Sequence, residues 1–348
     1  MQLYIGVDFH PHRQSVAWCD LETGEIKTQE LLHHSKQFDE FYQALPPAVI
    51  GIEASVNAVW FENLLANTSH QLLVGNPSLI RARARSRHKS DRRDAELILD
   101  LLMKDEFPAL WRRGGESHQV LDILKLRLNL LRHRTQIFNR LQALAHSFGL
   151  PSGRIKRAAL QERLKQSEVN PAQKLQRSQL FKTIANLDGQ IGELESWLHP
   201  QAETDRSVAL LQTQMGVGYL TALAAVHTLG DVWRFTKLSK QVVAFVGLDR
   251  LEKSSAGKQR FGAISKKGSS LLRRLLGEAG KMAARSDAKL KTFQLRLTKK
   301  KAKAVAKTAV SRKLLIKLAI MLRDGITAQE FETRGSAVGN ARTIQGQR

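Results

Sequence analysis

The first 112 residues alternate short apolar stretches with segments of helical periodicity. Five β-prone stretches are predicted as strands: Leu3 to Val7, Gln14 to Cys19, Glu25 to Leu32, Ala48 to Ile52 and Gln71 to Val74. Helices are predicted over three segments: Ser35 to Leu45, Ala58 to Asn67, and from near Ser90-Asp91 to about Met103. Three consecutive strands followed by alternating helix and strand indicate an α/β domain over residues 1–112.

The middle of the chain has the spacing of long helices. Apolar residues recur at alternating steps of three and four at Leu121, Leu124, Leu128, Leu131 and Phe138, and again at Leu180, Ile184, Leu187, Ile191, Leu194 and Leu198. The pattern, interrupted only at Thr135, predicts two long helices within residues 113–200, as an antiparallel hairpin or a coiled-coil dimer arm. Two core helices of one globular domain would show the same pattern, so both interpretations stay open.

Beyond residue 200 the pattern changes to short helices separated by glycine-containing turns, such as Gly216-Val217-Gly218 and Gly230-Asp231. A strongly basic helical region follows, in which twelve Lys and Arg residues between Lys281 and Lys313 face one acid, Asp287. We therefore predict an all-α domain over residues 201–333. Residues 334–348 are rich in Gly, Ser, Asn, Gln and Arg, a composition typical of a disordered tail.

The composition points to a polyanionic partner. The 348 residues include 55 Lys and Arg against 32 Asp and Glu, a formal net charge of +23. Such an excess favours binding to nucleic acid or to an anionic membrane surface. The most apolar stretch, residues 209–229, is interrupted by polar residues and glycines, unlike a membrane-spanning helix. No secretion signal is visible, and the single cysteine, Cys19, excludes an intrachain disulfide. We therefore expect a cytoplasmic, nucleoid-associated protein that binds nucleic acid and no membrane.

Four acids have positions that suit divalent-metal chemistry: Asp8, Glu53, Asp91 and Asp94. Asp8 and Glu53 each end a predicted strand, so both carboxylates leave the same sheet edge if the strands are neighbours. Asp91 and Asp94 are three residues apart at a helix start and share one helical face. Oxygen ligands on a rigid sheet suit Mg²⁺ or Mn²⁺, and paired ions can assist both oxygens of a phosphodiester transfer. Any one acid could instead be a turn residue or a helix cap, but the joint order of the four favours a metal site.

Basic residues accompany the acids. The chain carries Arg85, Arg87 and Lys89 just before Asp91, which suits phosphate entry, although a solvated basic loop has the same composition. His10 and His88 also lie near the acids in the sequence, and neither is assigned a role. A second basic segment is predicted to contact nucleic acid through a larger set of residues: Lys258, Arg260, Lys266, Lys267, Arg273 and Arg274.

The second basic segment contains Ser255 in a small-residue loop, between Lys253 and Lys258. Flanking cations stabilise a developing alkoxide and hold a phosphate, so such a serine could attack a phosphorus centre. A basic Gly/Ser loop that grips the DNA backbone would look the same, and the loop taken alone favours that simpler role. The glycine and lysine spacing of a nucleotide-binding P-loop is missing, so nucleotide binding is excluded.

Two sets of motifs resemble a known family. The N-terminal set is Tyr4-Ile5-Gly6-Val7-Asp8, Gly51-Ile52-Glu53-Ala54 and Lys89-Ser90-Asp91-Arg92-Arg93-Asp94-Ala95. The C-terminal set is Phe245-Val246-Gly247-Leu248, Ser254-Ser255-Ala256-Gly257-Lys258, Ile264-Ser265-Lys266-Lys267-Gly268 and Leu272-Arg273-Arg274-Leu275-Leu276. They are similar to the motifs of the DEDD transposases of the IS-one-ten insertion-sequence family, which includes the Piv invertase, and most of all to its IS-eleven-eleven branch. The resemblance covers residues 3–330.

The resemblance implies a RuvC-like (RNase H-type) N-terminal domain, a helical coiled-coil arm for dimerisation, and a C-terminal transposase domain with a nucleophilic serine. It implies that Asp8, Glu53, Asp91 and Asp94 form a metal tetrad, completed by the serine of another protomer in a homodimer or homotetramer. It also implies a structured RNA, encoded by the element, that selects donor and target DNA. The chain departs from the family pattern at Ala256, usually glycine, and at Asp249-Arg250, where a proline usually follows the Gly-Leu pair. Both departures flank the loop and leave Ser254 open as the alternative nucleophile.

The sequence therefore predicts an insertion-sequence transposase that cleaves and rejoins DNA with Mg²⁺ or Mn²⁺, the acidic tetrad and Ser255. One alternative is a RuvC-like, structure-selective nuclease that uses water attack alone, with the C-terminal domain only holding DNA. A non-enzymatic nucleic-acid-binding protein is the third interpretation, and the complete set of four acids argues against it.

Overall fold

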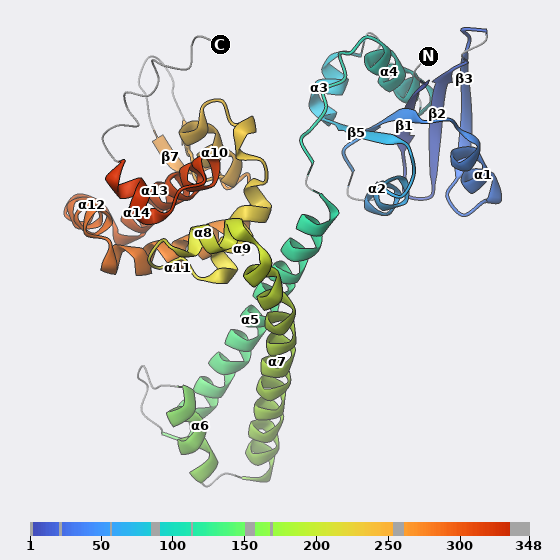
Figure 1. Cartoon of the computed structure of the whole chain (residues 1–348). Helices are drawn as coiled ribbons and strands as arrows, with labels where there is room; N and C mark the ends of the chain where they lie inside the picture. The colour runs from blue at the N-terminus through green and yellow to red at the C-terminus, as the bar shows by residue number, and fades with distance from the viewer. Residues whose placement is uncertain are drawn as a thin grey trace. The chain divides into compact units, whose positions relative to one another are not determined.

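The computed structural model describes residues 3–20, 23–55, 58–84, 91–112, 114–149, 157–167, 170–252 and 261–334. The chain divides into two compact units, residues 1–115 and 116–348, and each is described by itself (Figure 1). The first unit is a mixed α/β structure and the second is mostly helical, as the sequence predicts. Among the described residues no helix combines the length and apolar character that a membrane crossing requires.

The first unit is built on a five-stranded sheet with the order β3-β2-β1-β4-β5. Its strands are β1 (Leu3–Phe9), β2 (Arg13–Cys19), β3 (Ile26–Leu32), β4 (Ala48–Glu53) and β5 (Gln71–Gly75). The first three strands pair antiparallel, whereas β4 is parallel to both β1 and β5. The central pair, β1 and β4, therefore runs in one direction, and the two strands end at the same sheet edge.

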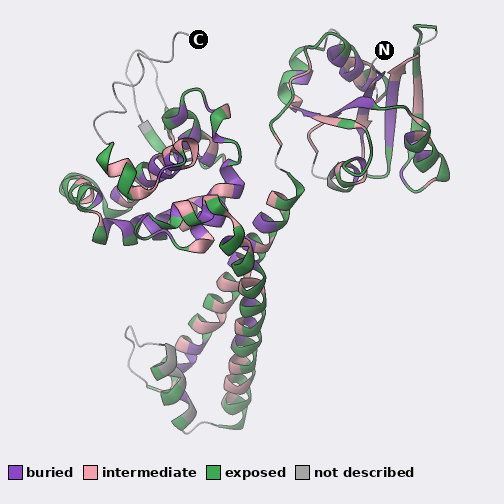
Figure 2. Ribbon diagram, in the orientation of Figure 1, coloured by how far each residue is buried: buried purple, intermediate pink, exposed green. Residues whose placement is uncertain are grey.

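Helices cover both faces of the sheet. One face packs against α1 (Lys36–Ala44) and α2 (Val59–Leu65), which contribute Phe38 and Phe61 to its core. The other packs against α4 (Asp91–Met103), whose Leu99 and Leu102 are buried, and α3 (Pro77–Ala82) lies on this side too. Buried residues concentrate in the sheet and in the inward faces of these helices (Figure 2). The sheet is thus the middle of three layers.

The second unit begins with two long helices, α5 (Gly115–Ser147) and α7 (Pro171–Thr204). They run antiparallel, because Arg127 pairs with Glu195 while Arg134, further along α5, pairs with Asp188, which comes earlier in α7. The base of the hairpin belongs to the C-terminal core, and the distal half has its own apolar cluster with Leu164 of α6 (Arg157–Gln166). The predicted pair of long helices is therefore an intramolecular hairpin.

The remainder of the second unit is a helical body. Its elements are α8 (Arg206–Gln212), α9 (Tyr219–Leu229), the short 3-10 helix η2 (Val232–Arg234), α10 (Leu238–Val246), β6 (Arg250–Glu252), β7 (Phe261–Ile264), α11 (Ser270–Ser286), α12 (Ala288–Thr298), α13 (Lys303–Asp324) and α14 (Ala328–Thr333). The helices α9, α11 and α13 contribute the largest sets of buried residues to its interior. Four elements are not predicted from the sequence: the paired strands β6 and β7, and the helices α3 and α6. Most of the expected tail, residues 335–348, lies outside the described residues.

Candidate active site

Two glycines bring α4 against the sheet and fix the face on which the acids lie. A Cβ atom at Gly6 would come within 2.2 Å of the Ala95 carbonyl oxygen, and one at Gly51 within 2.9 Å of the Ile98 side chain. Both glycines therefore face α4. Side chains two residues apart in a strand point to the same face, so Asp8 and Glu53 share this face with Gly6 and Gly51.

The sheet register places the two strand acids side by side. β1 and β4 are parallel neighbours, with Val7 opposite Ile52, so the condition under which Asp8 and Glu53 leave the same sheet edge is met. Asp8 lies within β1, one residue before its end, and Glu53 is the last residue of β4. Open α/β sheets bind ligands beyond the carboxyl ends of their strands, and here α4 begins beside that edge, with Asp91 and Asp94 in its first turn.

Contacts join two of the four acids through a histidine. Nε2 of His10 lies 3.1 Å from Oδ2 of Asp8 and 3.3 Å from Oδ2 of Asp91. Arg13, at the start of β2, also reaches Asp91, with 3.3 Å between Nη2 and Oδ2. The ligand atoms of Asp8, His10 and Asp91 all lie within 4.8 Å of one another, a group able to hold a metal ion.

The other two acids lie outside this group. Glu53 forms an ion pair with Arg81, with 3.4 Å between Nη2 and Oε1. Asp94 is near enough to act on Asp8 electrostatically. The structure thus brings Asp8 and Asp91 into one cluster. Glu53 lies next to Asp8 on the neighbouring strand but is paired with Arg81.

The environment of Asp8 disfavours a bare negative charge. Burial raises the pKa of the Asp8 carboxyl, His10 lowers it, and the charges of Asp94 and Asp91 raise it further, for a net increase. The Asp8 side chain is only 14% exposed, against 34% for Asp91. A bound cation would offset the repulsion between these carboxylates, so the donor set fits a divalent ion.

Sequence reasoning finds the acids but not all their partners. His10 is noted near Asp8 in the sequence but is given no role. The signal that could have identified it is its position two residues after the strand acid Asp8, because side chains two residues apart along a strand point to the same face. Arg13 is missed, because its contact with Asp91 depends on the pairing of β1 with β2 and on the docking of α4. Three predicted phosphate contacts, Arg85, Arg87 and Lys89, lie outside the described residues.

The second candidate site is the segment between β6 and β7. Ser254, Ser255, Lys258 and Arg260 all lie outside the described residues, so the structure describes only the base of this loop. At that base, the Lys266 N–H donates to the Gly247 carbonyl at 3.1 Å. A Cβ at Gly268 would come within 1.9 Å of the Phe245 carbonyl oxygen. The Phe-Val-Gly-Leu and Ser-Lys-Lys-Gly motifs therefore pack directly against each other.

Two partly buried arginines hold the same crossing. Arg273 donates to the carbonyls of Val246 and Gly268 at 2.8 and 2.7 Å, and Arg312 donates to that of Leu248 at 3.0 Å. Burial lowers the pKa of the Arg273 guanidinium. Arg273 therefore fixes the backbone at Val246 and Gly268, whatever contact it makes with nucleic acid.

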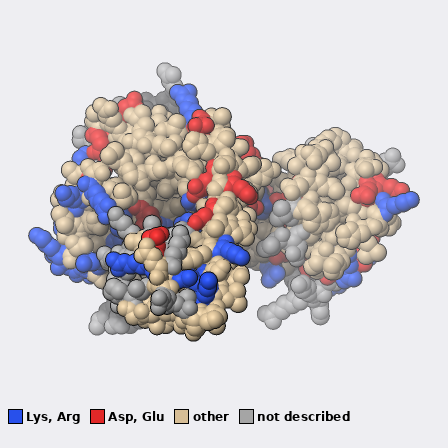
Figure 3. Space-filling view, turned by 90° about the horizontal axis from the view of Figure 1, so that it is seen from below, with Lys and Arg blue, Asp and Glu red and all other residues tan. Residues whose placement is uncertain are grey.

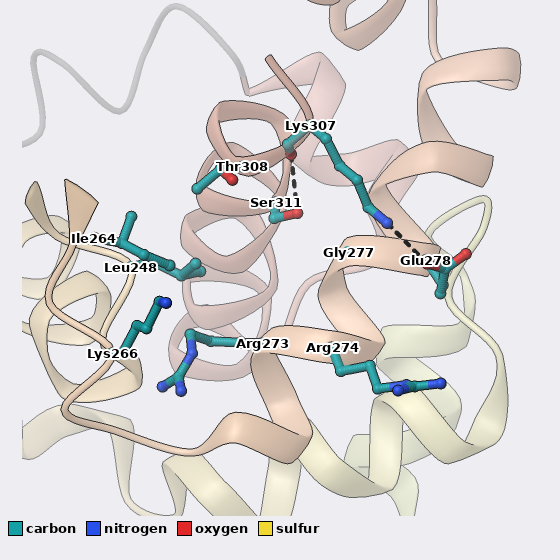
Figure 4. Close-up of a pocket in the computed structure, with 10 residues that line it drawn as sticks. All are labelled: Leu248, Ile264, Lys266, Arg273, Arg274, Gly277, Glu278, Lys307, Thr308 and Ser311. Carbon is teal, nitrogen blue, oxygen red and sulfur yellow. Dashed lines mark hydrogen bonds and ion pairs between the residues drawn. The ribbon is translucent and has the colours of Figure 1, made fainter. Parts of the chain in front are cut away.

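A basic cavity of about 560 Å³ adjoins this crossing. Figure 4 labels its lining residues, which include Lys266, Arg273, Arg274 and Lys307. Its acid, Glu278, accepts from Lys307 at 2.8 Å. Lys267, the remaining predicted contact in this region, is exposed. The cavity has the charge to receive a phosphate beside the base of the serine loop.

Exposed cations also follow α12 and the turn after it. Six of them have exposed side chains: Lys289, Lys291, Arg296, Lys299, Lys300 and Lys301. Blue side chains gather along one side of the C-terminal unit in Figure 3. Positively charged side chains therefore lie on the surface around α12 as well as at the cavity.

Comparison with known proteins gives two family matches. A DEDD transposase model of IS110 type matches residues 5–148, and the model described as the transposase IS116/IS110/IS902 family matches residues 208–294. These spans contain the four acids and the serine loop respectively. Over these two spans the chain is similar to transposases of the IS116/IS110/IS902 and IS110 DEDD types.

Individual relatives agree with this similarity. A probable family 20 transposase of Pseudomonas aeruginosa is 27% identical over 300 residues, 83% of this chain and 88% of the relative. The transposase for insertion sequence element IS1111A of Coxiella burnetii is 31% identical over 194 residues, 54% of this chain and 53% of the relative. That for element IS1328 of Yersinia enterocolitica is 26% identical over 250 residues, 71% of this chain and 74% of the relative.

Proposed function

We propose that this protein is a transposase that cuts and rejoins DNA by using an acidic metal site in its first unit and a serine in its second. The observation that carries the proposal is the meeting of Asp8 with Asp91 at the edge where β1 and β4 end. These residues come from segments 83 positions apart in the chain, yet both contact the His10 ring. The mixed sheet with acids at this edge also supports a RuvC-like assignment for the first unit.

In the proposed site, Asp8, Glu53, Asp91 and Asp94 hold one or two Mg²⁺ or Mn²⁺ ions. The bound ions would neutralise the phosphate and assist the attacking and leaving oxygens. Asp8 is fixed by its strand, Asp91 by the start of α4, and both are therefore positioned before DNA binds. Glu53 would exchange its ion pair with Arg81 for the metal, which leaves Arg81 available for a phosphate oxygen.

Ser255 is proposed as the nucleophile, with Ser254 as the alternative. Its Oγ–phosphorus bond would form as the bond from phosphorus to a deoxyribose oxygen breaks. The proton of the serine hydroxyl would leave to a base or to water, and the departing deoxyribose oxygen would take up a proton to become a hydroxyl. The phosphodiester is retained in the serine ester, so the reverse step rejoins DNA without a further energy source. Support comes from the family resemblance and from the basic cavity beside the loop base, where Lys266 and Arg274 could hold the phosphate.

Two further parts of the proposal rest on the family alone. They are the homodimer or homotetramer, in which the serine of one protomer meets the acids of another, and the structured RNA that selects the DNA. One structural observation favours the rival nuclease with water as nucleophile: the cluster of Asp8, His10 and Asp91 forms without any residue of the second unit.

The deciding experiment is to incubate the protein with DNA containing its element ends and a divalent cation, and to identify covalent adducts by mass spectrometry. We expect an adduct at Ser255 that disappears in Ser255→Ala and persists in Ser254→Ala, the matched control one residue away. Full recombination by Ser255→Ala, with adducts on neither serine, would reject the serine mechanism and leave the nuclease.

A further inference from the structure

His10 lies between the two acids that the structure brings together. Its Nε2 atom is 3.1 Å from an oxygen of Asp8 and 3.3 Å from an oxygen of Asp91. Ligands about 2.1 Å from an ion, at right angles to each other, are themselves separated by roughly 3 Å. His10 therefore has the spacing of a neighbouring ligand from each acid, and the ligand atoms of all three residues lie within 4.8 Å of one another.

The backbone holds the imidazole at this position. His10 directly follows β1. Its backbone N–H donates to the Arg13 carbonyl at 3.0 Å, which closes the tight connection to β2. The contact of His10 with Asp91, in the first turn of α4, places its side chain on the face that α4 covers, together with that of Asp8. The His10 side chain is 37% exposed, so an ion can reach it from solvent.

We propose that Nε2 of His10 is a ligand of the metal held by Asp8 and Asp91, in addition to the acidic tetrad. This inference rests on the proposed metal site and concerns its selectivity. Mg²⁺ binds almost entirely through oxygen, whereas imidazole is a ligand for transition metals. A nitrogen ligand among carboxylates therefore favours Mn²⁺, which takes both kinds of donor, over Mg²⁺.

The competing role for His10 is an ion-pair partner that only balances Asp8 and Asp91. That role makes no bond to the metal, so a spectrum of the bound ion separates the two. Mn²⁺ is paramagnetic, and pulsed electron paramagnetic resonance detects the nitrogen of a directly bound imidazole. The measurement uses the full chain with Mn²⁺ alone and needs no DNA.

We expect nitrogen modulation in the wild-type spectrum, and its loss in His10→Asn. His12→Asn is the matched control, because His12 is an exposed histidine in the same connection and outside the ligand group, and it should keep the signal. Losing one ligand should also lower Mn²⁺ affinity by about tenfold or more, with a smaller effect on Mg²⁺. Circular dichroism and Tm would verify that both variants fold.

The outcomes distinguish this inference from the metal site itself. Mn²⁺ bound by the wild type without nitrogen modulation would overturn the role of His10 and leave the acidic site standing. Unchanged modulation in His10→Asn would overturn it as well, since another histidine would then be the source. No Mn²⁺ binding by the wild type would reject both the ligand and the acidic site.

Discussion

At the scale of single residues, Asp8 and Asp91 differ in how they tolerate their charge. Asp8 sits in a strand against a helix, where burial and nearby carboxylates raise its pKa, whereas Asp91 is more exposed and contacts Arg13 and the His10 ring. A carboxylate that lies among other carboxylates is stabilised when a cation binds beside it. Removing the negative charge of one neighbouring carboxylate destabilises it little. This asymmetry makes Asp91 the informative position for a substitution.

We expect Asp91→Ala to abolish DNA strand cleavage while changing the free energy of unfolding by no more than about 1 kcal/mol. The substitution removes a proposed metal ligand. The contacts of Asp91 with His10 and Arg13 are partly exposed, and the stability lost with them is offset because a negative charge near Asp8 is removed. Cleavage assays and thermal unfolding would measure the two effects. Asp100→Ala is the control, because Asp100 lies on the same helix and pairs only locally with Lys104. Normal cleavage by Asp91→Ala would remove Asp91 from the site.

At the scale of elements, the docking of α4 on the sheet decides whether the acids meet. We predict that Gly6→Ala destabilises the first unit by about 1–3 kcal/mol or more, because the added methyl overlaps the Ala95 carbonyl and must push α4 away. Asp91 would move with the helix, so cleavage should fall as well. Chemical denaturation and cleavage assays test this.

Gly189→Ala provides the matched control for the glycine substitution. Gly189 lies in the middle of α7, and a Cβ there meets nothing within 4 Å. Alanine in a helix interior is favoured over glycine by roughly 0.5–1 kcal/mol, so this variant should be as stable as the wild type or more so. Equal stability of the two alanine variants would contradict the close packing of α4.

Most elements of the first unit are predictable because each strand and helix has a clear local pattern. The helix predicted over Ser35 to Leu45 is observed from Lys36 to Ala44, with Ser35 as its N-cap. The missed α3 is short, yet its signal was present in Asn76 as cap and Pro77 as first residue. The β6 strand is missed because its three residues are all exposed and show no alternation.

The candidate site is less predictable than the fold because it depends on contacts between distant segments. The acids can be picked out by their order along the chain. The pairing of Glu53 with Arg81, and the reach of Arg13 to Asp91, require the sheet order and the placement of α4 and are not encoded in any local pattern. Arg273 shows the converse: its charge predicts a phosphate contact, whereas the structure reveals its carbonyl partners.

At the scale of the whole molecule, the net charge of +23 dominates the interaction with nucleic acid. We expect affinity for duplex DNA to fall by orders of magnitude over a few-fold rise in salt, if about six or more phosphates are contacted. The exposed cations of α12 and the turn after it supply contacts of this kind. Fluorescence anisotropy across a series of KCl concentrations gives the slope, and an affinity independent of salt would contradict the prediction.

A triple substitution of Lys299, Lys300 and Lys301 by Gln should reduce that salt slope by about three, one for each phosphate that no longer has a lysine partner. Lys104→Gln is the control, because Lys104 is already paired with Asp100 and should leave the slope unchanged. An unaltered slope in the triple variant would assign the phosphate binding to other cations, such as those around the basic cavity.

The antiparallel hairpin of α5 and α7 can vary in length independently of the helical body. Only its base belongs to the C-terminal core, while the distal half is held by its own small cluster and by ion pairs along its length. Seven residues make nearly two helical turns, so adding or removing seven in each helix preserves which side chains face each other and moves the tip by about 10 Å. Matched insertions can therefore lengthen the arm, and matched deletions can shorten it, while the helical body that anchors it stays the same.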